Sequence, residues 1–164
     1  MVVKSELLIR RAKTPGETVF MAELAVRAWQ TAARHHIEVT DESRAALHTK
    51  FLCDINENAD GILVAERQGQ VCGWGARIPK SNYISDLWID PAYHGQGLGG
   101  LLLNALMAQI LLESFAEAEI GTHADNLPAI GLYRKAGFAV YWQEEEWSES
   151  FGRRVEKVRM KVGL

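Results

Sequence analysis

The segment Pro91–Gly100 constrains this chain more than any other part, because it concentrates glycines between two ordered stretches. A strand-like run, residues 83–90, precedes it, and a long apolar run, residues 101–112, follows it. Glycines lack the Cβ atoms that block close approach, and the first turn of a helix adds unpaired N–H groups and its dipole. The segment therefore predicts a phosphate-binding turn, with a purely structural turn as the alternative.

Two known phosphate-binding fingerprints do not fit this segment. A P-loop requires Lys followed by Ser or Thr after its second glycine, whereas three leucines follow Gly100. The dinucleotide fingerprint requires an acidic residue about 20 residues further on. Glu117 and Glu119 lie near that distance, but the glycine spacing after His94 is offset from the pattern.

A second motif, Asn126–Phe138, follows the short strand-like run 118–124. Asn126 stands where a helix N-cap is expected, Pro128 falls in the first turn, and Gly137 is a C-cap signal. Four side chains share one face of this predicted helix: Ala129, Leu132, Tyr133 and Ala136. Taken alone, the motif describes a well-capped amphipathic helix with a core tyrosine.

Taken together, the two motifs resemble the GNAT superfamily of acyl-CoA-dependent N-acetyltransferases. The signature of that family pairs a Gln/Arg-x-x-Gly-x-Gly/Ala loop with a later Asn-x-x-Ala-x-x-x-Tyr-x-x-x-Gly-Phe helix. The resemblance runs from about Tyr83 to Phe138, in family order. His94 departs from it, because the family usually has Gln or Arg there. We expect this change to alter affinity or its pH dependence rather than to abolish binding.

The order of predicted elements is that of the GNAT fold, strand–helix–helix–three strands–helix–strand–helix–two strands. The fold class is α/β (α+β): a mixed, mostly antiparallel sheet of about seven strands flanked by four helices, in a single domain over residues 1–164. The predicted strands are 7–11, 61–67, 71–78, 83–90, 118–124, 138–147 and 153–162, and the predicted helices are 15–33, 41–53, 98–115 and one beginning at Asn126.

The resemblance implies acetyl-CoA as co-substrate, bound where strands 83–90 and 118–124 splay apart. The pantetheine arm would follow the backbone of Leu87, Trp88 and Ile89, and Asn126 would hydrogen-bond near the cofactor. The pyrophosphate would lie on the loop formed by His94, Gly95, Gln96, Gly97, Leu98, Gly99 and Gly100. Tyr133 would direct its hydroxyl at the thioester sulfur, since a phenol of ordinary pKa about 10 can protonate a thiolate.

The general base is less constrained, and several candidates remain. Regular alternation places Tyr83 and Ser85 on one face of their strand and Asp86 on the other, although a bulge would reverse that parity. On the second strand, His123 shares a face with Gly121 and titrates in a useful range. Ribosomal-protein alanine acetyltransferases carry glutamate where this chain has Gly121, which argues against that subgroup. Ser85, Asp86, His123 and a water relay all stay open.

The acceptor is predicted to be a primary amine of a small molecule or peptide. In such folds the segment between the first two helices and the last hairpin determine specificity. The first carries Trp29, Arg34, His35, His36 and Glu38, and the second carries the acidic run 144–147. Their mixed charge identifies no substrate. The alternative function is a catalytically silent module that binds acyl-CoA or CoA and regulates a partner.

Composition narrows the remaining choices of partner, metal and location. The 164 residues are 48% hydrophobic with a formal net charge of −3, which gives no support for a nucleic-acid partner. No Cys/His cluster has metal-ligand spacing, so we expect no metal. The run 98–112 is too short for a membrane span, and the first residues lack the apolar core of a signal peptide, so we expect a cytoplasmic protein without a membrane partner. Pairing of the final hairpin leaves a homodimer open.

Overall fold

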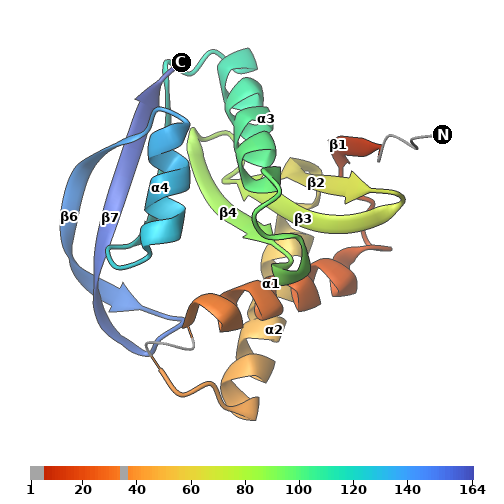
Figure 1. Cartoon of the computed structure of the whole chain (residues 1–164), viewed down its shortest axis with the longest axis vertical. Coiled ribbons are helices and arrows are strands. Elements are labelled where there is room, and N and C mark those ends of the chain that lie inside the picture. The colour runs from red at the N-terminus through yellow and green to blue at the C-terminus, as the bar shows by residue number, and fades with distance from the viewer. Residues whose placement is uncertain (1–5, 34–36) are drawn as a thin grey trace.

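The computed structural model describes residues 6–33 and 37–164, and these form one open sheet with helices on both faces (Figure 1). The described strands lie in the order β1-β2-β3-β4-β5-β7-β6. All neighbouring pairs are antiparallel except β4 and β5, which are parallel. The strands are β1 Leu7–Arg11, β2 Ile62–Arg67, β3 Gln70–Arg77, β4 Tyr83–Ile89, β5 Glu117–His123, β6 Ala139–Ser148 and β7 Arg153–Gly163.

The helices also follow the predicted order, with differences at three ends. The first begins at Thr18 rather than at residue 15, the second runs to Glu57 rather than Cys53, and the third ends at Leu112 rather than at residue 115, because Ser114 adopts a positive φ of 68°. They are α1 Thr18–Ala33, α2 Asp41–Glu57, α3 Leu98–Leu112 and α4 Leu127–Lys135, with short 3₁₀ turns η1 Ala59–Gly61 and η2 Pro91–Tyr93. The predicted mixed sheet with four helices is confirmed. Helix α2 extends one turn beyond the predicted end at Cys53, because Ile55 continues the buried stripe of Leu47 and Phe51.

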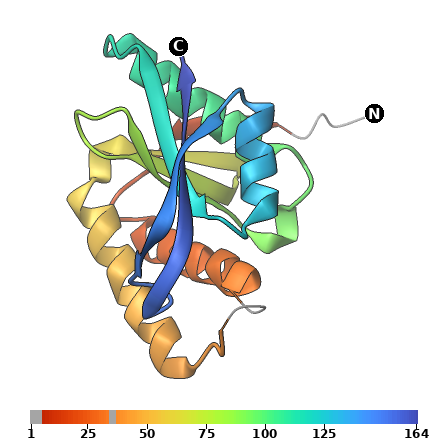
Figure 2. The same ribbon diagram turned by 90° about the vertical axis from the view of Figure 1, so that its left-hand side faces the viewer.

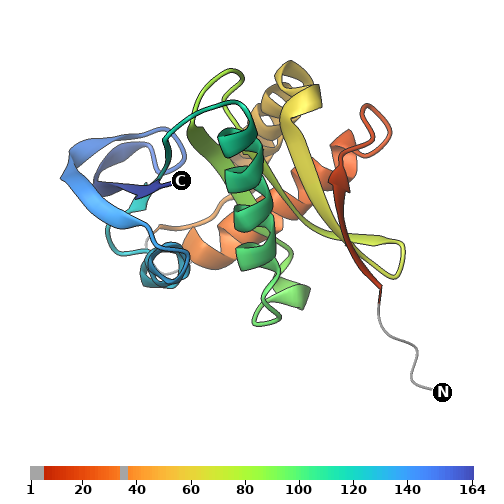
Figure 3. The ribbon, with the colours of Figure 1, turned by 90° about the horizontal axis from the view of Figure 1, so that it is seen from above.

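Two helical layers enclose the sheet, and each has its own core. Helices α1 and α2 cover one face and pack on Val64 and Trp74 of the sheet. Helices α3 and α4 cover the other face and pack on Ile84, Ile120 and Met160. Figure 2 shows α2 on one side of the β6–β7 hairpin and α4 on the other, with α1 crossing behind the hairpin. Figure 3 shows α3 between that hairpin and the strands at the opposite end of the sheet.

A β-bulge at Ser85 determines which way the middle of β4 faces. In β3, Ala76 lies opposite Asp86 and Arg77 lies opposite Ile84, so Ser85 has no partner of its own. The extra residue reverses the alternation of side chains. Ile84 and Leu87 therefore both pack in the α3–α4 layer, whereas Trp88 packs in the α1–α2 layer. Regular alternation was the wrong prediction here, and Asp86 shares a face with Tyr83 because of the bulge.

Strands β4 and β5 stay together over only two residue pairs. Tyr83 lies opposite Glu119 and Ile84 lies opposite Ile120. Beyond this point β5 continues to pair with β7, and β4 continues to pair with β3. The predicted separation of the two strands is confirmed, and it leaves the inner edge of β4 from Leu87 to Ile89 unpaired with β5.

Candidate functional site

A groove of about 420 Å³ occupies the region where β4 and β5 part. The second half of β4, the glycine loop, the start of α3 and one face of α4 form its walls, with Ala28 and Ala32 of α1 at the end. Of the residues predicted to hold a cofactor, ten line this groove: Leu87, Trp88, Ile89, His94, Gly95, Gly97, Leu98, Gly99, Gly100 and Asn126. Tyr133 lines it as well, so the structure brings the two sequence motifs together.

The glycine loop presents backbone rather than side chains to the groove. Gly95 and Gly97 adopt the left-handed region, with φ of 75° and 79°, and a Cβ on either would enter open space. Gly97 is also the N-cap of α3, whose first N–H groups lack partners within the helix. These features suit an anionic group of phosphate size, because donors and the positive end of the helix dipole meet where no side chain intrudes.

Gly99 has a different reason for being glycine. A Cβ at this position would lie 2.9 Å from Cδ2 of Leu132 in α4, whereas the same atom on Gly100 would lie 3.9 Å from Leu132. The missing side chain therefore lets α3 approach α4 closely. Sequence spacing suggested a phosphate role for Gly99, and the structure gives it a packing role.

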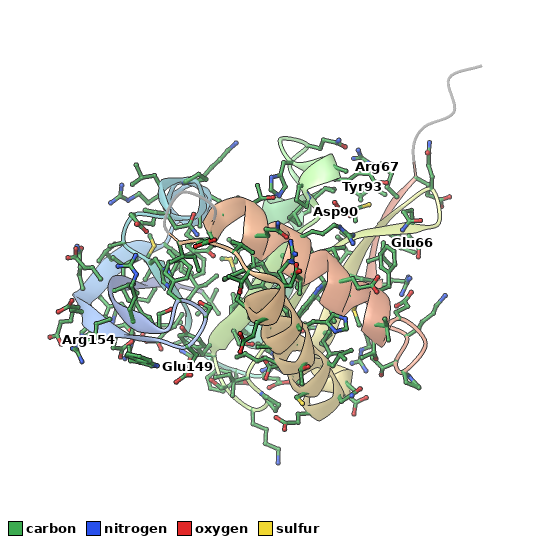
Figure 4. The ribbon with its side chains drawn as sticks, turned by 90° about the horizontal axis from the view of Figure 1, so that it is seen from below. Glu66, Arg67, Asp90, Tyr93, Glu149 and Arg154 are labelled. Atoms are coloured by element: carbon green, nitrogen blue, oxygen red, sulfur yellow. The ribbon has the colours of Figure 1, made fainter. Side chains whose placement is uncertain are left out.

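Two arginines from distant elements hold the loop in place. Arg27 of α1 donates to Asp90 at 2.8 Å, and Asp90 in turn accepts the backbone N–H of Ala92 at 3.1 Å. Arg67 at the end of β2 donates to the side-chain oxygen of Gln96, which turns this predicted cofactor residue away from the groove. Figure 4 shows Arg67, Asp90 and Tyr93 close together at this end of the molecule. Sequence patterns missed both arginines because each acts from a remote strand or helix.

His94 closes part of the unpaired edge of β4. Its Nε2 atom lies 2.9 Å from the carbonyl oxygen of Ile89. A carbonyl oxygen only accepts hydrogen bonds, so Nε2 carries the proton in this contact. The backbone predicted to pair with a pantetheine arm therefore keeps its free groups at Leu87, whereas Trp88 pairs with Trp74 of β3 and the carbonyl of Ile89 already has a partner.

Asn126 and Tyr133 are both presented by α4. The Asn126 side chain caps the helix by accepting the N–H of Ala129 at 3.4 Å and donates to Thr122 Oγ1 of β5 at 3.0 Å. The predicted N-cap is confirmed, and this side chain fixes α4 to the end of β5. Tyr133 is buried, and burial is the main reason that its pKa is raised, followed by the nearby Tyr83. Its phenol therefore stays protonated at neutral pH.

On the opposite face, Asp86 and Ser85 border a pocket of about 490 Å³ beneath α2. The Asp86 carboxylate accepts the Ser85 hydroxyl at 2.9 Å and the Trp88 indole N–H at 3.1 Å. Burial raises the pKa of Asp86, and these two hydrogen bonds oppose that rise. Trp88 also lines the groove at the β4–β5 separation, so this carboxylate contacts a residue of the groove wall.

His123, the third candidate base, lies at the far end of β5. It borders a pocket of about 440 Å³ that shares His94 and Asn126 with the cofactor groove. Its Nε2 atom lies 3.3 Å from Oγ of Ser148, and its ring meets Phe151 edge-on at 4.4 Å. His123 is therefore adjacent to the groove, but three residues beyond the last β4–β5 pair, whereas Asp86 lies two residues beyond it.

The residues predicted to determine the acceptor have separate locations. Trp29 is buried in the α1–α2 core, which gives it a packing role. Arg34, His35 and His36 lie outside the described residues. Glu38 borders a hollow between α2 and the β6–β7 turn. Glu146 of the acidic run pairs with Arg159 at 3.0 Å and so is partly neutralised.

Neither a metal cluster nor a membrane span is found in the described ranges. Within residues 6–33 and 37–164, no three His, Cys, Asp or Glu side chains gather closely enough to hold a metal ion. Over the same ranges, no helix has both the length and the apolar character needed to cross a membrane.

The family resemblance suggested by the two motifs extends over residues well outside them. The acetyltransferase (GNAT) family matches residues 19–138, which is most of the chain and includes both motifs. The chain belongs to the GNAT acetyltransferase family. This membership extends to α1 and to β2–β3, where the sequence carries no recognisable signature.

Curated relatives are distant and longer. An N-acetyltransferase of Methanocaldococcus jannaschii, MJ1207, described as uncharacterised, is 24% identical over 110 residues, which is 66% of this chain and 45% of that protein. A mycothiol acetyltransferase of an Arthrobacter species is 26% identical over 136 residues, which is 78% of this chain and 41% of that protein. This GNAT chain therefore matches less than half the length of these relatives.

Solved structures share the fold over the whole chain. A GCN5-related N-acetyltransferase from Rhodopseudomonas palustris superposes with a TM-score of 0.77 and 19% identity, covering 100% of this chain and 99% of that one. The PaiA N-acetyltransferase of Thermoplasma acidophilum, solved in complex with coenzyme A, gives 0.74 and 17% identity, covering 97% and 99%. These similarities establish the GNAT fold of this chain.

Proposed function

We propose that this protein transfers the acetyl group of acetyl-CoA directly to a primary amine of a small molecule or peptide. The observation that carries this proposal is the groove at the β4–β5 separation. It combines a side-chain-free glycine loop at one end with the Tyr133 phenol on its wall. The Thermoplasma acidophilum relative was solved with coenzyme A bound, which supports the same class of ligand for this groove.

The groove suits acetyl-CoA in its shape and in its hydrogen-bonding groups. Open space over Gly95 and Gly97 admits the pyrophosphate to the N–H groups at the start of α3. The unpaired edge of β4 at Leu87 offers backbone groups to the amide-bearing pantetheine arm, in the manner of an added strand. Arg27 and Arg67 keep the loop in this arrangement.

Starting from an ammonium, the reaction removes two protons from the nitrogen and supplies one to the departing sulfur. Acetyl-CoA supplies a thioester, whose carbonyl carbon forms a bond to the amine nitrogen while its C–S bond breaks. Tyr133 donates its phenolic proton to the departing sulfur, which leaves as CoA thiol, and the phenol regains a proton from solvent. Its raised pKa keeps that proton available at neutral pH.

Asp86 is the base that the geometry favours. An alkylamine is mostly protonated at pH 7, and its nitrogen must lose a proton before or during attack. Asp86 lies on the face opposite α4, next to the separation of the strands, and its raised pKa makes the carboxylate a stronger acceptor of that proton. The proton of the substrate ammonium passes through Asp86 to solvent. The nitrogen loses its second proton as the C–N bond forms and the C–S bond breaks, and that proton balances the one given up by Tyr133.

Calorimetric titration with acetyl-CoA and with CoA tests the first half of this proposal. Gly97→Glu places a carboxylate in the phosphate cradle, and we expect it to weaken binding at least about 100-fold through charge repulsion and steric block. Gly69→Glu is the matched control. Gly69 has φ of 78° and open space over its Cβ, but lies in the β2–β3 turn, so it adds the same strain and charge away from the groove.

Thiol release from acetyl-CoA in the presence of amines tests the second half. Saturable binding that Gly97→Glu abolishes and Gly69→Glu retains, together with amine-dependent thiol release, supports the enzyme. Binding without thiol release for any amine would instead indicate a silent CoA-binding module. Absence of binding to either ligand would overturn the proposal altogether.

A further inference from the structure

The Tyr83 hydroxyl lies over Gly121 at the point where β4 and β5 part. A Cβ built on Gly121 would be 2.9 Å from this oxygen, so the phenol occupies the space that a side chain at residue 121 would take. Tyr83 and Ile84 are the last residues of β4 that pair with β5. The ring thus reaches from β4 across to β5 and ends level with Gly121, the first residue of β5 that no longer pairs with β4.

Tyr83 and Tyr133 approach this opening from opposite faces. Ile84 and Ile120 pack in the α3–α4 layer, so their neighbours Tyr83 and Gly121 face the other side. Tyr133 belongs to the α3–α4 layer and lines the cofactor groove. The two phenols are close enough that Tyr83 contributes to the raised pKa of Tyr133. An acyl group that reaches the opening would therefore have one phenol on each side.

The bulge at Ser85 places Asp86 on the same face as Tyr83. Asp86 is also among the groups whose charge acts on Tyr83, together with Arg159, Glu119 and Glu146. Burial is the largest effect on the Tyr83 hydroxyl and raises its pKa, so this phenol is neutral at physiological pH. A neutral phenol oxygen accepts a hydrogen bond, whereas the Asp86 carboxylate accepts a proton.

We propose that Tyr83 positions the acceptor amine, with its oxygen accepting one N–H of the amine while the nitrogen lone pair faces the thioester carbonyl. This inference rests on the proposed acetyl transfer and adds the residue that orients its nucleophile. Gly121 is part of the same device, because only a residue without Cβ leaves room for the hydroxyl over β5. Tyr83 touches the acceptor alone and makes no contribution to acetyl-CoA binding.

The experiment measures steady-state thiol release by the full chain with acetyl-CoA and three probe amines, glycinamide, putrescine and tyramine. The variants are Tyr83→Phe, Gly121→Ala and their combination, with Tyr141→Phe as a matched control. Tyr141 is 45% exposed on β6, contacts Glu119 and is near enough for Tyr83 to act on its pKa, so this control removes a neighbouring phenol that does not occupy the space over Gly121. Calorimetry on each variant reports acetyl-CoA affinity separately.

Tyr83→Phe should raise the KM for the amine about tenfold, as expected for one lost hydrogen bond, while the Kd for acetyl-CoA stays within about twofold. Gly121→Ala should raise the amine KM similarly, because its methyl group displaces the hydroxyl. The double variant should be no worse than Tyr83→Phe alone, since no hydroxyl remains to displace. Gly121→Ala brings its methyl 3.2 Å from the Val158 carbonyl in both the wild-type and the Tyr83→Phe background, so this contact cancels in the coupling energy of the double-mutant cycle.

The outcomes separate this inference from the function on which it rests. If the wild-type protein binds acetyl-CoA but acetylates none of the three amines, the proposed function fails and the role of Tyr83 fails with it. If the wild type is active and Tyr83→Phe keeps its amine KM, or the two single effects simply add, only the role of Tyr83 is overturned. A change in acetyl-CoA Kd would show that Tyr83 is a general structural residue instead.

Discussion

The two sides of the β4–β5 opening differ in whether backbone or side chains form their surface. On the α3–α4 side, the groove consists largely of backbone: the free edge of β4, two left-handed glycines and the start of a helix. On the α1–α2 side, side chains determine the surface, chiefly Tyr83, Ser85 and Asp86. A ligand shared by a whole family can be bound by backbone, whereas a variable acceptor requires side chains that each member can change.

This difference explains why a motif marks one side and not the other. Backbone binding depends on glycine positions and helix caps, which are local and visible in the sequence. The acceptor side depends on which way β4 side chains face, and that is set by pairing with β3. Substitutions on one side should therefore leave the other side largely unaffected, with Tyr133 as the point where the two meet.

The largest effect is expected for Tyr133→Phe, the residue that joins the two sides. Loss of the phenolic proton should lower kcat about 10²- to 10³-fold, within the usual range for a general acid, while CoA affinity stays unchanged because the ring remains. Turnover assays paired with calorimetry give both numbers. A loss of CoA affinity comparable to the loss of kcat would contradict the placing of Tyr133 between the two sides, since Tyr133 would then belong to the cofactor side alone.

A smaller effect on rate is expected for Asp86→Asn, with a distinct pH signature. Asp86 must be ionised to accept a proton, and burial raises its pKa, so the activity of the wild type should climb as pH rises through that raised value. The variant should lose about 10- to 100-fold in kcat/KM at neutral pH together with this acid limb. If the pH dependence of kcat/KM were unchanged in Asp86→Asn, the base would be His123 or water.

The same substitution should stabilise the fold. A carboxyl whose pKa is raised in the folded state binds its proton more tightly there, so folding stability increases as pH falls through the raised value. Above that pH the wild type carries a buried charge that Asn lacks. Thermal unfolding should therefore show Asp86→Asn as the more stable protein at neutral pH, with the difference vanishing below the ordinary pKa of aspartate. A less stable variant at pH 7 would contradict this account.

The smallest effect concerns two neighbouring glycines of α3. Gly100→Ala should stabilise the protein by about 0.5–1 kcal/mol through helix propensity, since its Cβ meets nothing closer than 3.9 Å. Gly99→Ala gains the same propensity but must displace Leu132, so it should be less stable than Gly100→Ala by about 1 kcal/mol. For a chain of this size that difference is about 2–4 °C in Tm. Equal Tm values for Gly99→Ala and Gly100→Ala would show that Gly99 is needed for ligand binding and not for packing.

Much of this molecule was predictable because its signals are local. The turn between the predicted strands 61–67 and 71–78, the N-cap at Asn126 and the glycine at 137 each determine an element from within a few residues, and all three are confirmed. The family resemblance then arranged these elements into the correct sheet. Both motifs lie in this well-predicted stretch, and the structure brings them together at one groove.

The acceptor side was harder to predict from the sequence, for a physical reason. Whether Asp86 faces α2 or α3 depends on a single unpaired residue in β4, and only the register with β3 reveals it. The contact of Tyr83 with the space over Gly121 joins residues 38 positions apart in different strands, and no spacing rule connects them. The orientation of Gln96 toward Arg67 similarly depends on where the β2–β3 hairpin ends.

The brief pairing of β4 and β5 has a consequence for the behaviour of the protein in solution. Besides the two outer strands, β1 and β6, the sheet has a third edge inside it, the inner side of β4 beyond Ile84. Unpaired strand edges can pair with strands of other chains and so promote aggregation, and proteins usually cover them. A bound acyl-CoA would cover this one, and its binding energy would add to the stability of the native state by mass action. The concentration of this metabolite would then set how long the protein survives without aggregating.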